Sequence, residues 1–435
     1  MKDSGIDWIG KIPDEWEVCK LKYLLKTNLQ YGANSSGIEF NENLPRYVRI
    51  TDIKSSEALY EKGKLSLSEE DSIGYLLQDG DILFARSGAT VGKTFLYHSN
   101  IGKAAFAGYL IRAQLNENLN PKFLSYYTLS SGYDEWKNRI FIQATIQNIG
   151  ADKYANIKIP LPPLSEQTKI ANFLDKKCAQ IDSIIEESKK SIEEYKSWKQ
   201  SVIFEAVTGK NLSCKKKDSG IEWLGEIPEE WEVQRLKSYF NFKKGLPITK
   251  ENLEDSGISV ISYGQIHSKN NNGVSICNEL IRFVDKSYLK SNSESLVKKG
   301  DFIFADTSED LEGCGNCAYV NSDEIIFAGY HTIIFSSKYQ NENKYLAYLF
   351  LTDAWRTQIR CNCSGVKLFS ITKKILSKVS IILPPLSEQE SIANFLEKKC
   401  TQIDSLISEK QSLIKDLAEY KKSLIFEAVT GKRRV

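Results

Sequence analysis

Long apolar runs are missing from this chain. No stretch approaches the ~18–20 consecutive apolar residues needed to cross a bilayer, although 41% of the 435 residues are hydrophobic. The first residues, Met1–Ser4, also lack the apolar segment that is typical of a signal peptide. We therefore expect a cytoplasmic protein that has no membrane partner.

Ligands for a metal ion are sparse. The three histidines, His98, His267 and His331, have no metal-ligand spacing. The nine cysteines are odd in number and scattered, which favours reduced thiols. Cys314–Cys317 and Cys361–Cys363 could offer four thiolates to zinc, but the Cys-x-Cys spacing is unusual for such a site. The sequence predicts no metal ion and no cofactor bound by this chain.

The chain also lacks a large excess of positive charge. The formal net charge of the chain is +2, residues 1–160 are neutral overall, and residues 218–382 carry a net charge of −2. A protein that holds DNA by bulk charge alone would be basic. Any contact of this chain with phosphate must therefore come from a local patch or from a partner protein.

What the chain does contain is one unit that occurs twice. The sixteen residues Asp3–Val18 return at Asp218–Val233 with twelve identities. Four further segments return as well, namely Gly80–Ala85 at Gly300–Ala305, Phe106–Tyr109 at Phe327–Tyr330, Leu161–Gln167 at Leu383–Gln389, and Ile203–Lys210 at Ile425–Lys432. The middle segments, about 30–80 and 240–300, share little. A duplicated framework with two different middles indicates two readers of different targets, and drift after duplication is the alternative.

Each unit divides into a mixed α/β part and one long helix. Asp81–Ala85 and Ala105–Ala113 are β-rich, and Pro121–Leu129 is a short helical stretch. We expect globular domains at 1–160 and 211–382, followed by long helices at 161–210 and 383–435.

The ends of the two helices have recognisable signals. Ser165 and Ser387 suit the N-cap position, where a hydroxyl accepts a backbone hydrogen bond. Gly209 and Gly431 suit the position after the last turn, which favours the left-handed conformation. Each helix then has about 40 residues and a length of roughly 60 Å.

Apolar residues recur along both helices at alternating steps of four and three, which is a heptad pattern. These positions include Leu174, Ile181, Ile185 and Ile192 in the first helix and Leu396, Ile403, Ile407, Ile414 and Leu417 in the second. Polar residues weaken the seam at Ser188, Lys199, Lys410 and Lys421. A second apolar edge, formed by Ile184, Leu406 and Leu413, could serve another partner.

Pairing of the two helices with each other, in antiparallel orientation, is the economical way to bury both seams. Helices that serve only as a structural or dimerisation stalk for the globular domains fit the spacing equally well. The predicted fold class is α+β, with two mixed α/β domains separated by an antiparallel coiled coil of two long helices and related by a pseudo-two-fold axis.

The order of these motifs resembles that of the specificity subunits of type I restriction–modification systems. A variable segment is followed by Gly-Asp-Ile-Leu-Phe-Ala-Arg-Ser-Gly, by the Leu-Pro-Pro-Leu-Ser-Glu-Gln junction, and by a long helix that ends near Glu-Ala-Val-Thr-Gly. The pattern occurs twice and covers nearly the whole chain. The resemblance implies two target-recognition domains, each reading one half of a bipartite double-stranded DNA site. It also implies that the helices set the gap between the halves and dock two methylation subunits.

The same resemblance implies a subunit that is not itself catalytic. The methylation subunits would modify adenine N6 with S-adenosylmethionine, and restriction subunits would translocate and cut DNA with ATP and magnesium. An Asn/Asp-Pro-Pro-aromatic motif of amino-methyltransferases is absent from the sequence, since leucine flanks both Pro-Pro pairs.

Ser87–Thr94 looks like a phosphate-binding loop but fails its spacing. That loop needs four residues between its first glycine and Gly-Lys-Ser/Thr, whereas three residues separate Gly88 from Gly92. A nucleotide-dependent enzyme is therefore disfavoured. The segment fits better as a turn whose backbone approaches a phosphate, or simply as a polar hairpin tip.

The candidates for contact with DNA lie in this turn and in the loops before the junctions. The resemblance implies that the loops at 143–148 and 365–370 face DNA, and a solvated loop that only positions the helix is the alternative. Amide, hydroxyl and ammonium groups there can bond to base edges or phosphate. The candidates are Arg86, Ser87, Thr90, Lys93, Gln143, Thr145, Gln147, Asn148, Lys367 and Ser370.

A coiled-coil adaptor with protein-binding heads is the second interpretation. Repetition of the helix and the junction around divergent middles favours the DNA-reading subunit. Because both globular parts are nearly neutral, the chain alone should bind DNA weakly and with a shallow salt dependence.

Overall fold

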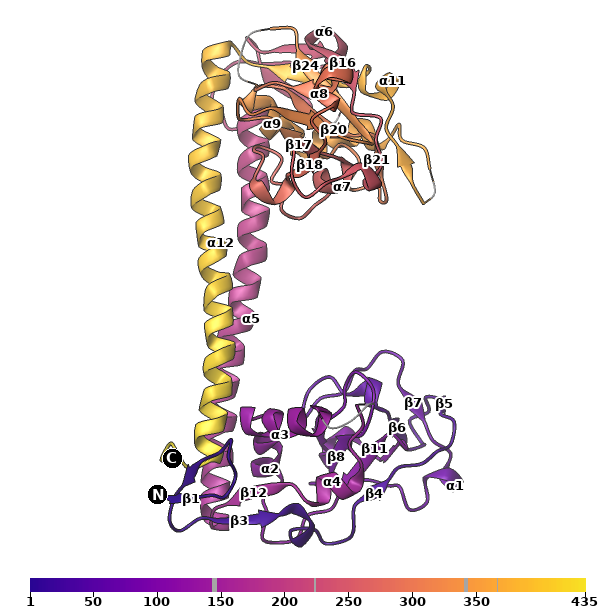
Figure 1. Ribbon diagram of the computed structural model, residues 1–435, viewed down its shortest axis with the longest axis vertical. Helices are drawn as coiled ribbons and strands as arrows, with labels where there is room; N and C mark the ends of the chain where they lie inside the picture. Colours follow the sequence, from indigo (N-terminus) through magenta and orange to yellow (C-terminus); the bar gives the residue numbers. More distant parts are fainter. Residues whose placement is uncertain (143–146, 223, 340–342, 366) are drawn as a thin grey trace. The chain divides into compact units, whose positions relative to one another are not determined.

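The computed structural model describes residues 1–142, 147–222, 224–339, 343–365 and 367–435. These residues form two compact units (Figure 1). Unit 1 contains residues 1–190 and 410–435, and unit 2 contains residues 191–409. Each unit combines one mixed α/β body with part of each long helix, α5 (Leu164–Thr208) and α12 (Leu386–Val429).

A four-stranded antiparallel sheet lies at the centre of unit 1. Its strands follow the order β4 (Gln30–Tyr31), β11 (Leu110–Ala113), β8 (Ile82–Ala85) and β9 (Thr94–Leu96). A second, mixed sheet has the order β10 (Ala104–Phe106), β6 (Arg46–Val48), β7 (Leu65–Ser66) and β5 (Ile38–Glu39), with β10 parallel to β6.

Unit 2 repeats the first sheet with the same strand order. The strands are β16 (Phe240–Lys244), β24 (Thr332–Ser337), β20 (Phe302–Ala305) and β22 (Cys317–Tyr319). Its second sheet has the order β18 (Arg282–Val284), β17 (Ile258–Ile261), β23 (Ile326–Ala328) and β19 (Leu296–Val297). The parallel pair β17–β23 matches β6–β10, whereas the neighbouring strands differ. The divergent middles of the sequence supply three of the four strands of each second sheet, namely β5, β6 and β7 in unit 1 and β17, β18 and β19 in unit 2.

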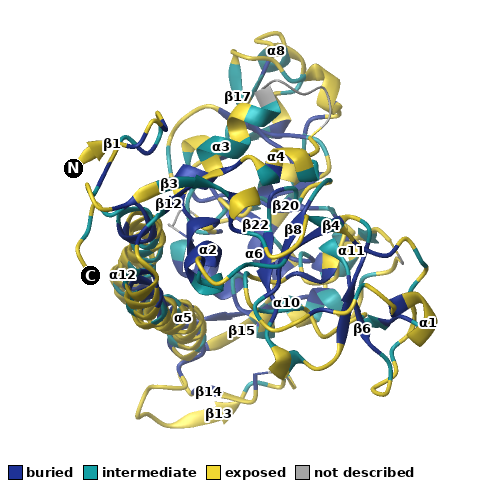
Figure 2. Cartoon of the chain, turned by 90° about the horizontal axis from the view of Figure 1, so that it is seen from below, coloured by how far each residue is buried: buried dark blue, intermediate teal, exposed yellow. Residues whose placement is uncertain are grey.

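Strand β8 is buried on both faces because it separates two cores. Ile82 and Phe84 lie in one core, and Leu83 and Ala85 lie in the other with residues of the second sheet. This is the alternation that a pleated strand imposes, and a strand covered on both sides reads as a continuous apolar run. Strand β20 follows the same rule, and Figure 2 shows the central strands in dark blue.

Short ribbons and helices complete each unit. The ribbons pair β1 (Lys2–Asp3) with β2 (Lys11–Ile12), β3 (Glu17–Lys20) with β12 (Lys158–Leu161), β13 (Lys216–Asp218) with β14 (Glu226–Pro228), β15 (Glu232–Arg235) with β26 (Ser380–Leu383), and β21 (Thr307–Ser308) with β25 (Phe369–Ser370). The helices of unit 1 are α1 (Glu69–Ser72), α2 (Pro121–Tyr127), α3 (Ser131–Ile142) and α4 (Ala151–Ala155). Those of unit 2 are α6 (Leu236–Tyr239), α7 (Tyr263–Ile266), α8 (Tyr288–Ser291), α9 (Lys344–Phe350), α10 (Asp353–Arg360) and α11 (Lys373–Leu376). The β-rich and helical segments predicted from the sequence are confirmed.

The two long helices pack against each other in antiparallel orientation. In unit 1, Leu174 of α5 shares one core with Leu424 of α12. In unit 2, Ile203 of α5 shares one core with Leu396 of α12. The early part of α5 therefore meets the late part of α12 in unit 1, and the reverse holds in unit 2. The predicted α+β fold with an antiparallel helix pair is confirmed.

The side chains of the heptad positions are turned inward within each unit. All nine of the apolar positions given above are buried or partly buried. The residues of the second apolar edge, Ile184, Leu406 and Leu413, are instead exposed. In Figure 2 both helices show a continuous exposed surface in yellow.

Both helix C-termini have the predicted glycine. Gly209 and Gly431 adopt φ values of 67° and 70°, which favour glycine. The amide of Lys210 donates to the carbonyl of Glu205 (3.1 Å), and the amide of Lys432 donates to that of Glu427 (2.8 Å). These are the bonds of a Schellman motif.

The predicted N-cap positions were wrong by two residues, because the residues before the helices are Pro163 and Pro385. The helices begin at Leu164 and Leu386, so Ser165 and Ser387 lie inside the first turn. The carbonyl of Pro163 accepts the amide of Gln167 (3.0 Å) and opens the helix instead. A proline ring fixes φ near the helical value, so a helix can start directly after it.

Two absences apply to the part of the chain that the structure describes. It contains no helix that is long and apolar enough to span a membrane. It also contains no group of three or more His, Cys, Asp or Glu side chains that could hold a metal ion. Of the four cysteines considered for zinc, Cys314 and Cys317 are buried and Cys361 is exposed.

Candidate functional sites

Each unit has an open pocket at the end of its central sheet. The Arg86 pocket of unit 1 has a volume of about 940 Å³, and the Asp306 pocket of unit 2 has one of about 600 Å³. The lining of the first includes Asn34, Tyr47, Arg49, Arg86, Tyr109 and Asn148, and that of the second includes Lys244, Asp306, Tyr330, His331, Ser370 and Lys373.

Backbone hydrogen bonds hold Arg86 from two sides. Its amide donates to the carbonyl of Tyr109 (3.0 Å), in the turn that leads into β11. Its carbonyl accepts the amide of Ile149 (2.8 Å), which belongs to the segment before α4. The adjacent residue Ser87 forms a β-bridge with Asn148. The main chain at Arg86 is therefore fixed by the scaffold.

Asp306 has the same pair of bonds in unit 2. Its amide donates to the carbonyl of His331 (3.0 Å), and its carbonyl accepts the amide of Ile371 (2.7 Å). The next residue, Thr307, pairs with Ser370 in the β21–β25 ribbon. Arg86 and Asp306 thus occupy equivalent positions, directly after the last residues of β8 and β20.

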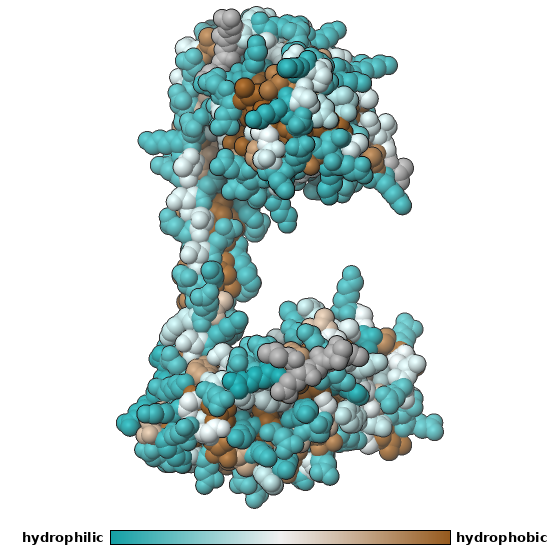
Figure 3. Space-filling model, in the orientation of Figure 1, coloured by the Kyte–Doolittle hydropathy of each residue, from teal (hydrophilic) through white to brown (hydrophobic). Residues whose placement is uncertain are grey.

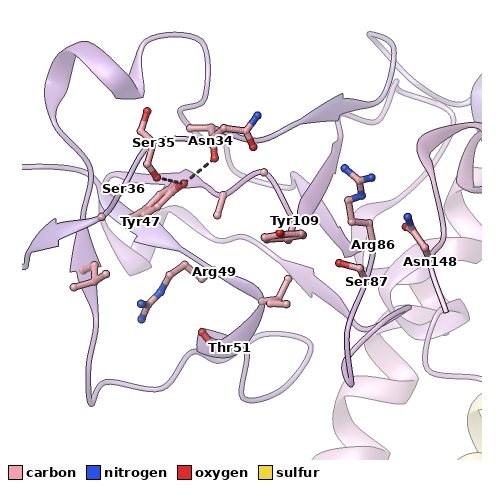
Figure 4. Close-up of a pocket in the computed structure, with 16 residues that line it drawn as sticks. Asn34, Ser35, Ser36, Tyr47, Arg49, Thr51, Arg86, Ser87, Tyr109 and Asn148 are labelled. Carbon is pink, nitrogen blue, oxygen red and sulfur yellow. Dashed lines mark hydrogen bonds between the residues drawn. The ribbon is translucent and has the colours of Figure 1, made fainter. Parts of the chain in front are cut away.

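The side chain of Arg86 is held over an aromatic ring. Its guanidinium carbon lies 4.9 Å from the ring centroid of Tyr31, a distance typical of a cation–π contact. The Nε atom is buried and has no hydrogen-bond partner among the described residues. Figure 4 shows Arg86, Asn148 and Tyr109 close together at one side of the pocket.

The other arginine of this pocket has its charge satisfied. Arg49 makes a two-pronged contact with Asp52, at 2.7 and 3.0 Å, and also donates to the carbonyl of Gly63 (2.8 Å). The pKa of Arg49 is raised, chiefly by its hydrogen bond to Asp52. The hydroxyl of Tyr47 donates to the carbonyl of Ala33 (2.7 Å), and burial raises its pKa. These two side chains shape the pocket wall.

In the Asp306 pocket the dominant group is an acceptor. Oδ1 of Asp306 accepts the hydroxyl of Thr307 (2.7 Å) and lies 3.2 Å from Nδ1 of His331. Its Oδ2 makes no hydrogen bond to any described residue. The carboxylate therefore has an oxygen left for a ligand that donates a hydrogen bond.

His331 has an unusual backbone. Its φ of 54° is the one positive value at a non-glycine residue in the described chain, and such values are uncommon and costly. The imidazole lies 5.4 Å from the ring of Tyr263, in an edge-on arrangement, and is largely exposed. Lys373 donates to the carbonyl of Phe242 (3.1 Å), and burial lowers its pKa.

The structure distributes the ten predicted DNA-contact residues unevenly. Arg86, Ser87 and Asn148 line the Arg86 pocket, and Ser370 lines the Asp306 pocket. Gln147 and Lys367 are exposed in the loops before the junctions. Gln143 and Thr145 lie outside the described residues.

The remaining two candidates, Thr90 and Lys93, lie in the hairpin between β8 and β9. Lys93 donates to the carbonyl of Ile53 (2.8 Å), so its ammonium anchors the hairpin to a neighbouring loop. The hydroxyl of Thr90 is buried and has no partner among the described residues. Segment 87–94 is thus a hairpin turn rather than a loop that opens a helix, which agrees with its failed glycine spacing.

Sequence reasoning did not select Asp306, His331 or Tyr109. The sequence shows acidic residues after Ala305, but by residue type they indicate only that unit 2 differs from unit 1 at Arg86 and Ser87. The signal that could have found Asp306 is the repeat itself, because aligning Ala85 with Ala305 places Arg86 opposite Asp306.

Comparison with known proteins decides the family. The model of the type I restriction modification DNA specificity domain matches residues 13–194 and again residues 228–416. The chain belongs to this family. Each of the two matches contains one of the pockets, so this specificity subunit carries two copies of the domain.

Curated relatives are similar over three quarters or more of this chain. The MjaVIII specificity subunit of Methanocaldococcus jannaschii is 23% identical, over 98% of this chain and 94% of the relative. The putative MjaX specificity subunit of the same organism is 29% identical, over 98% and 96%. The EcoKI specificity subunit of Escherichia coli K12 is 25% identical, over 81% and 74%.

Solved structures show the same fold. A chain from a structure on complex assembly and conformational transition of the type I R-M system has a TM-score of 0.74, at 16% identity, and the match covers 97% of this chain and 100% of that one. The HsdS subunit of Thermoanaerobacter tengcongensis has a TM-score of 0.59, at 16% identity, over 97% and 98%. The chain is a DNA sequence specificity subunit of a type I restriction–modification system.

Proposed function

We propose that unit 1 and unit 2 each read one half of a split DNA site, and that the chain itself performs no chemistry. The observation that carries the proposal is the pair of equivalent pockets. One scaffold presents Arg86 in unit 1 and Asp306 in unit 2. A scaffold of constant geometry with side chains of opposite hydrogen-bonding character suits two half-sites of different sequence.

The paired helices are the element that sets the gap between the half-sites. A coiled coil resists bending and fixes the register of its helices. The ion pairs Lys421–Asp182 in unit 1 and Lys199–Asp404 in unit 2 support one register. A fixed register predicts one gap length rather than a distribution.

The outer surface of the helices is proposed to dock two methylation subunits. Exposed apolar residues occur at equivalent places of the repeat, as Ile184 and Leu406, and as Trp198 and Tyr420. Figure 3 shows hydrophobic residues, in brown, on the visible side of the helices. Because unit 1 carries Ile184 with Tyr420 and unit 2 carries Leu406 with Trp198, each unit offers a matching set. Two matching sets suit two copies of one partner.

The partners would supply the chemistry in the cytoplasm. Methylation subunits would use S-adenosylmethionine, and restriction subunits would use ATP and magnesium. This chain would contribute sequence recognition and geometry, which is consistent with its neutral globular parts and with the need for a partner to neutralise phosphates.

Sequencing of methylated DNA tests the proposal. The chain is co-expressed with its methylation subunit in a host without other adenine methylation, and N6-methyladenine is mapped by single-molecule sequencing. We expect one split motif, with two unlike halves and a constant gap. An uninterrupted motif, or methylation that does not depend on this chain, would contradict the proposal.

A further inference from the structure

The residue that follows strand β8 or β20 makes the same two main-chain hydrogen bonds in both units, but its side chain is a cation in unit 1 and an anion in unit 2. Arg86 and Asp306 donate and accept through the same two backbone bonds, while Ala85 and Ala305 before them are identical and buried. The framework therefore has no structural reason to require a cation in one unit and an anion in the other. The difference in charge therefore reflects the ligand that each pocket binds.

We propose that this position determines one base of each half-site. Arg86 reads a guanine through its O6 and N7 acceptors, and Asp306 reads an exocyclic amino group, that of cytosine or adenine. The inference rests on the proposed function, because it needs DNA to face the two pockets. It goes further in naming the residue and the chemical group that it selects.

Arg86 is suited to this role because its guanidinium is positioned but not neutralised. No ion pair of Arg86 occurs among the described residues, and Tyr31 supports its plane from one side. Arg49, in the same pocket, is instead bound to Asp52. A guanidinium carries only donors, and two of them match the two acceptors on the major-groove edge of guanine.

Asp306 is suited to the opposite role because the pocket orients its carboxylate. Thr307 and His331 both bond to Oδ1, which leaves Oδ2 for a donor from outside. Nδ1 of His331 lies 3.2 Å from Oδ1, so the imidazole orients the carboxylate from that side. An amino group on cytosine N4 or adenine N6 is the donor that a carboxylate selects in the major groove.

The first test uses methylation motifs of variants. Arg86→Ala should lower the preference for guanine at one position of one half-site by roughly 10–100-fold and leave the other half unchanged. Asp306→Ala should relax one position of the other half-site. Lys11→Ala and Asp323→Asn remove exposed charges elsewhere in the same units and should leave both halves as in the wild type.

The second test changes the DNA and begins with the wild-type complex. The wild-type complex is titrated with duplexes in which each guanine of the half-site in turn is replaced by 7-deazaguanine, which lacks the N7 acceptor. We expect one guanine whose replacement weakens binding about tenfold, and we expect the Arg86→Ala complex to be indifferent to that replacement. The wild-type base at the position that Asp306→Ala relaxes shows whether Asp306 reads cytosine or adenine.

The outcomes separate this inference from the proposed function. A half-site without guanine, or an Arg86→Ala complex as sensitive to 7-deazaguanine as the wild type, would overturn the role of Arg86. An unchanged motif for Asp306→Ala would overturn that of Asp306. In each case a split motif would still stand for the wild type. If the wild type gives no split motif, the proposed function fails first.

Discussion

The ammonium of Lys421 on helix α12 lies 2.6 Å from a carboxylate oxygen of Asp182 on helix α5. The same contact recurs in unit 2 between Lys199 and Asp404, also at 2.6 Å. Both lysines occupy seam positions that the sequence suggested would weaken the helix pair. Their aliphatic stems can cover apolar neighbours while the charged ends reach an acidic partner. Each lysine therefore favours the one register of the helices in which it meets its aspartate.

Charge reversal should expose this pairing. Lys421→Glu places two carboxylates together and should reduce the free energy of unfolding by about 1 kcal/mol, since such partly exposed pairs are worth little individually. Adding Asp182→Lys should restore most of the loss. Urea unfolding of the two single variants and the double variant measures the coupling. Additive losses in the double variant would show that the two side chains do not interact in solution.

The C-terminal glycine of α12 should be hard to replace. A Cβ at Gly431 would lie 2.3 Å from Cδ of Pro13, and its φ of 70° is itself unfavourable for alanine. Gly431→Ala should therefore cost about 2 kcal/mol or more. Gly5→Ala is the matched control, because Gly5 has a similar φ of 64° but open space around the added atom. It should cost about 1 kcal/mol, and equal losses in thermal unfolding would rule out the close packing.

The sequence predicted the fold well because duplication doubles every framework signal. The heptad steps, the Pro-Pro junction and the terminal glycine each occur twice, and each is a local feature with a direct structural consequence. The N-cap position could not be resolved, since Ser165 and Pro163 are both compatible with a helix start. The pockets could not be predicted, because they depend on long-range bonds such as those of Arg86 with Tyr109 and Ile149.

The candidate site was therefore recovered only in part. Arg86, Ser87 and Asn148 were selected by their residue types and by the family resemblance, and they meet in one pocket. Asp306 directly follows the repeated segment Gly300–Ala305, and His331 directly follows Phe327–Tyr330, but the residue type changes between the repeats at both positions, so residue type alone did not select them. Their role in binding DNA, like that of every residue in the two pockets, stays a prediction.

Acid should stabilise the turn before β20. Asp301 is buried, and burial raises the pKa of its carboxyl above the usual value. The folded state therefore binds a proton more tightly than the unfolded state, so this group stabilises folding as the pH falls through its folded pKa and opposes folding at neutral pH. Asp301→Asn should be more stable than the wild type at pH 7, and the difference should disappear below about pH 4.

That pH dependence is checked by urea unfolding from about pH 3 to about pH 8. The side-chain carbonyl oxygen of asparagine can still accept a hydrogen bond from the backbone amide of Lys298, which in the wild type donates to Oδ2 of Asp301 over 3.0 Å. Asp323→Asn, at an exposed site, is the control for the loss of one charge. A variant that is less stable than the wild type at pH 7 would show that the carboxylate is favoured by its surroundings.

DNA binding by the chain alone should depend only weakly on salt. The globular parts have net charges of 0 and −2 over residues 1–160 and 218–382. Each phosphate that a protein neutralises adds roughly −0.9 to the slope of log affinity against log salt. Titrations at several salt concentrations should give a steeper slope with methylation subunits than without them. Equal slopes would mean that this chain makes the phosphate contacts itself.

A chimera with two identical globular parts tests whether each unit reads one half-site. Residues 3–160 are replaced by a second copy of 218–382, so that both heads carry Asp306 and its pocket. We expect the assembled methylase to modify a split site whose two halves are inverted copies of the half that unit 2 reads in the wild type. A folded, active chimera that keeps two unlike halves would contradict it.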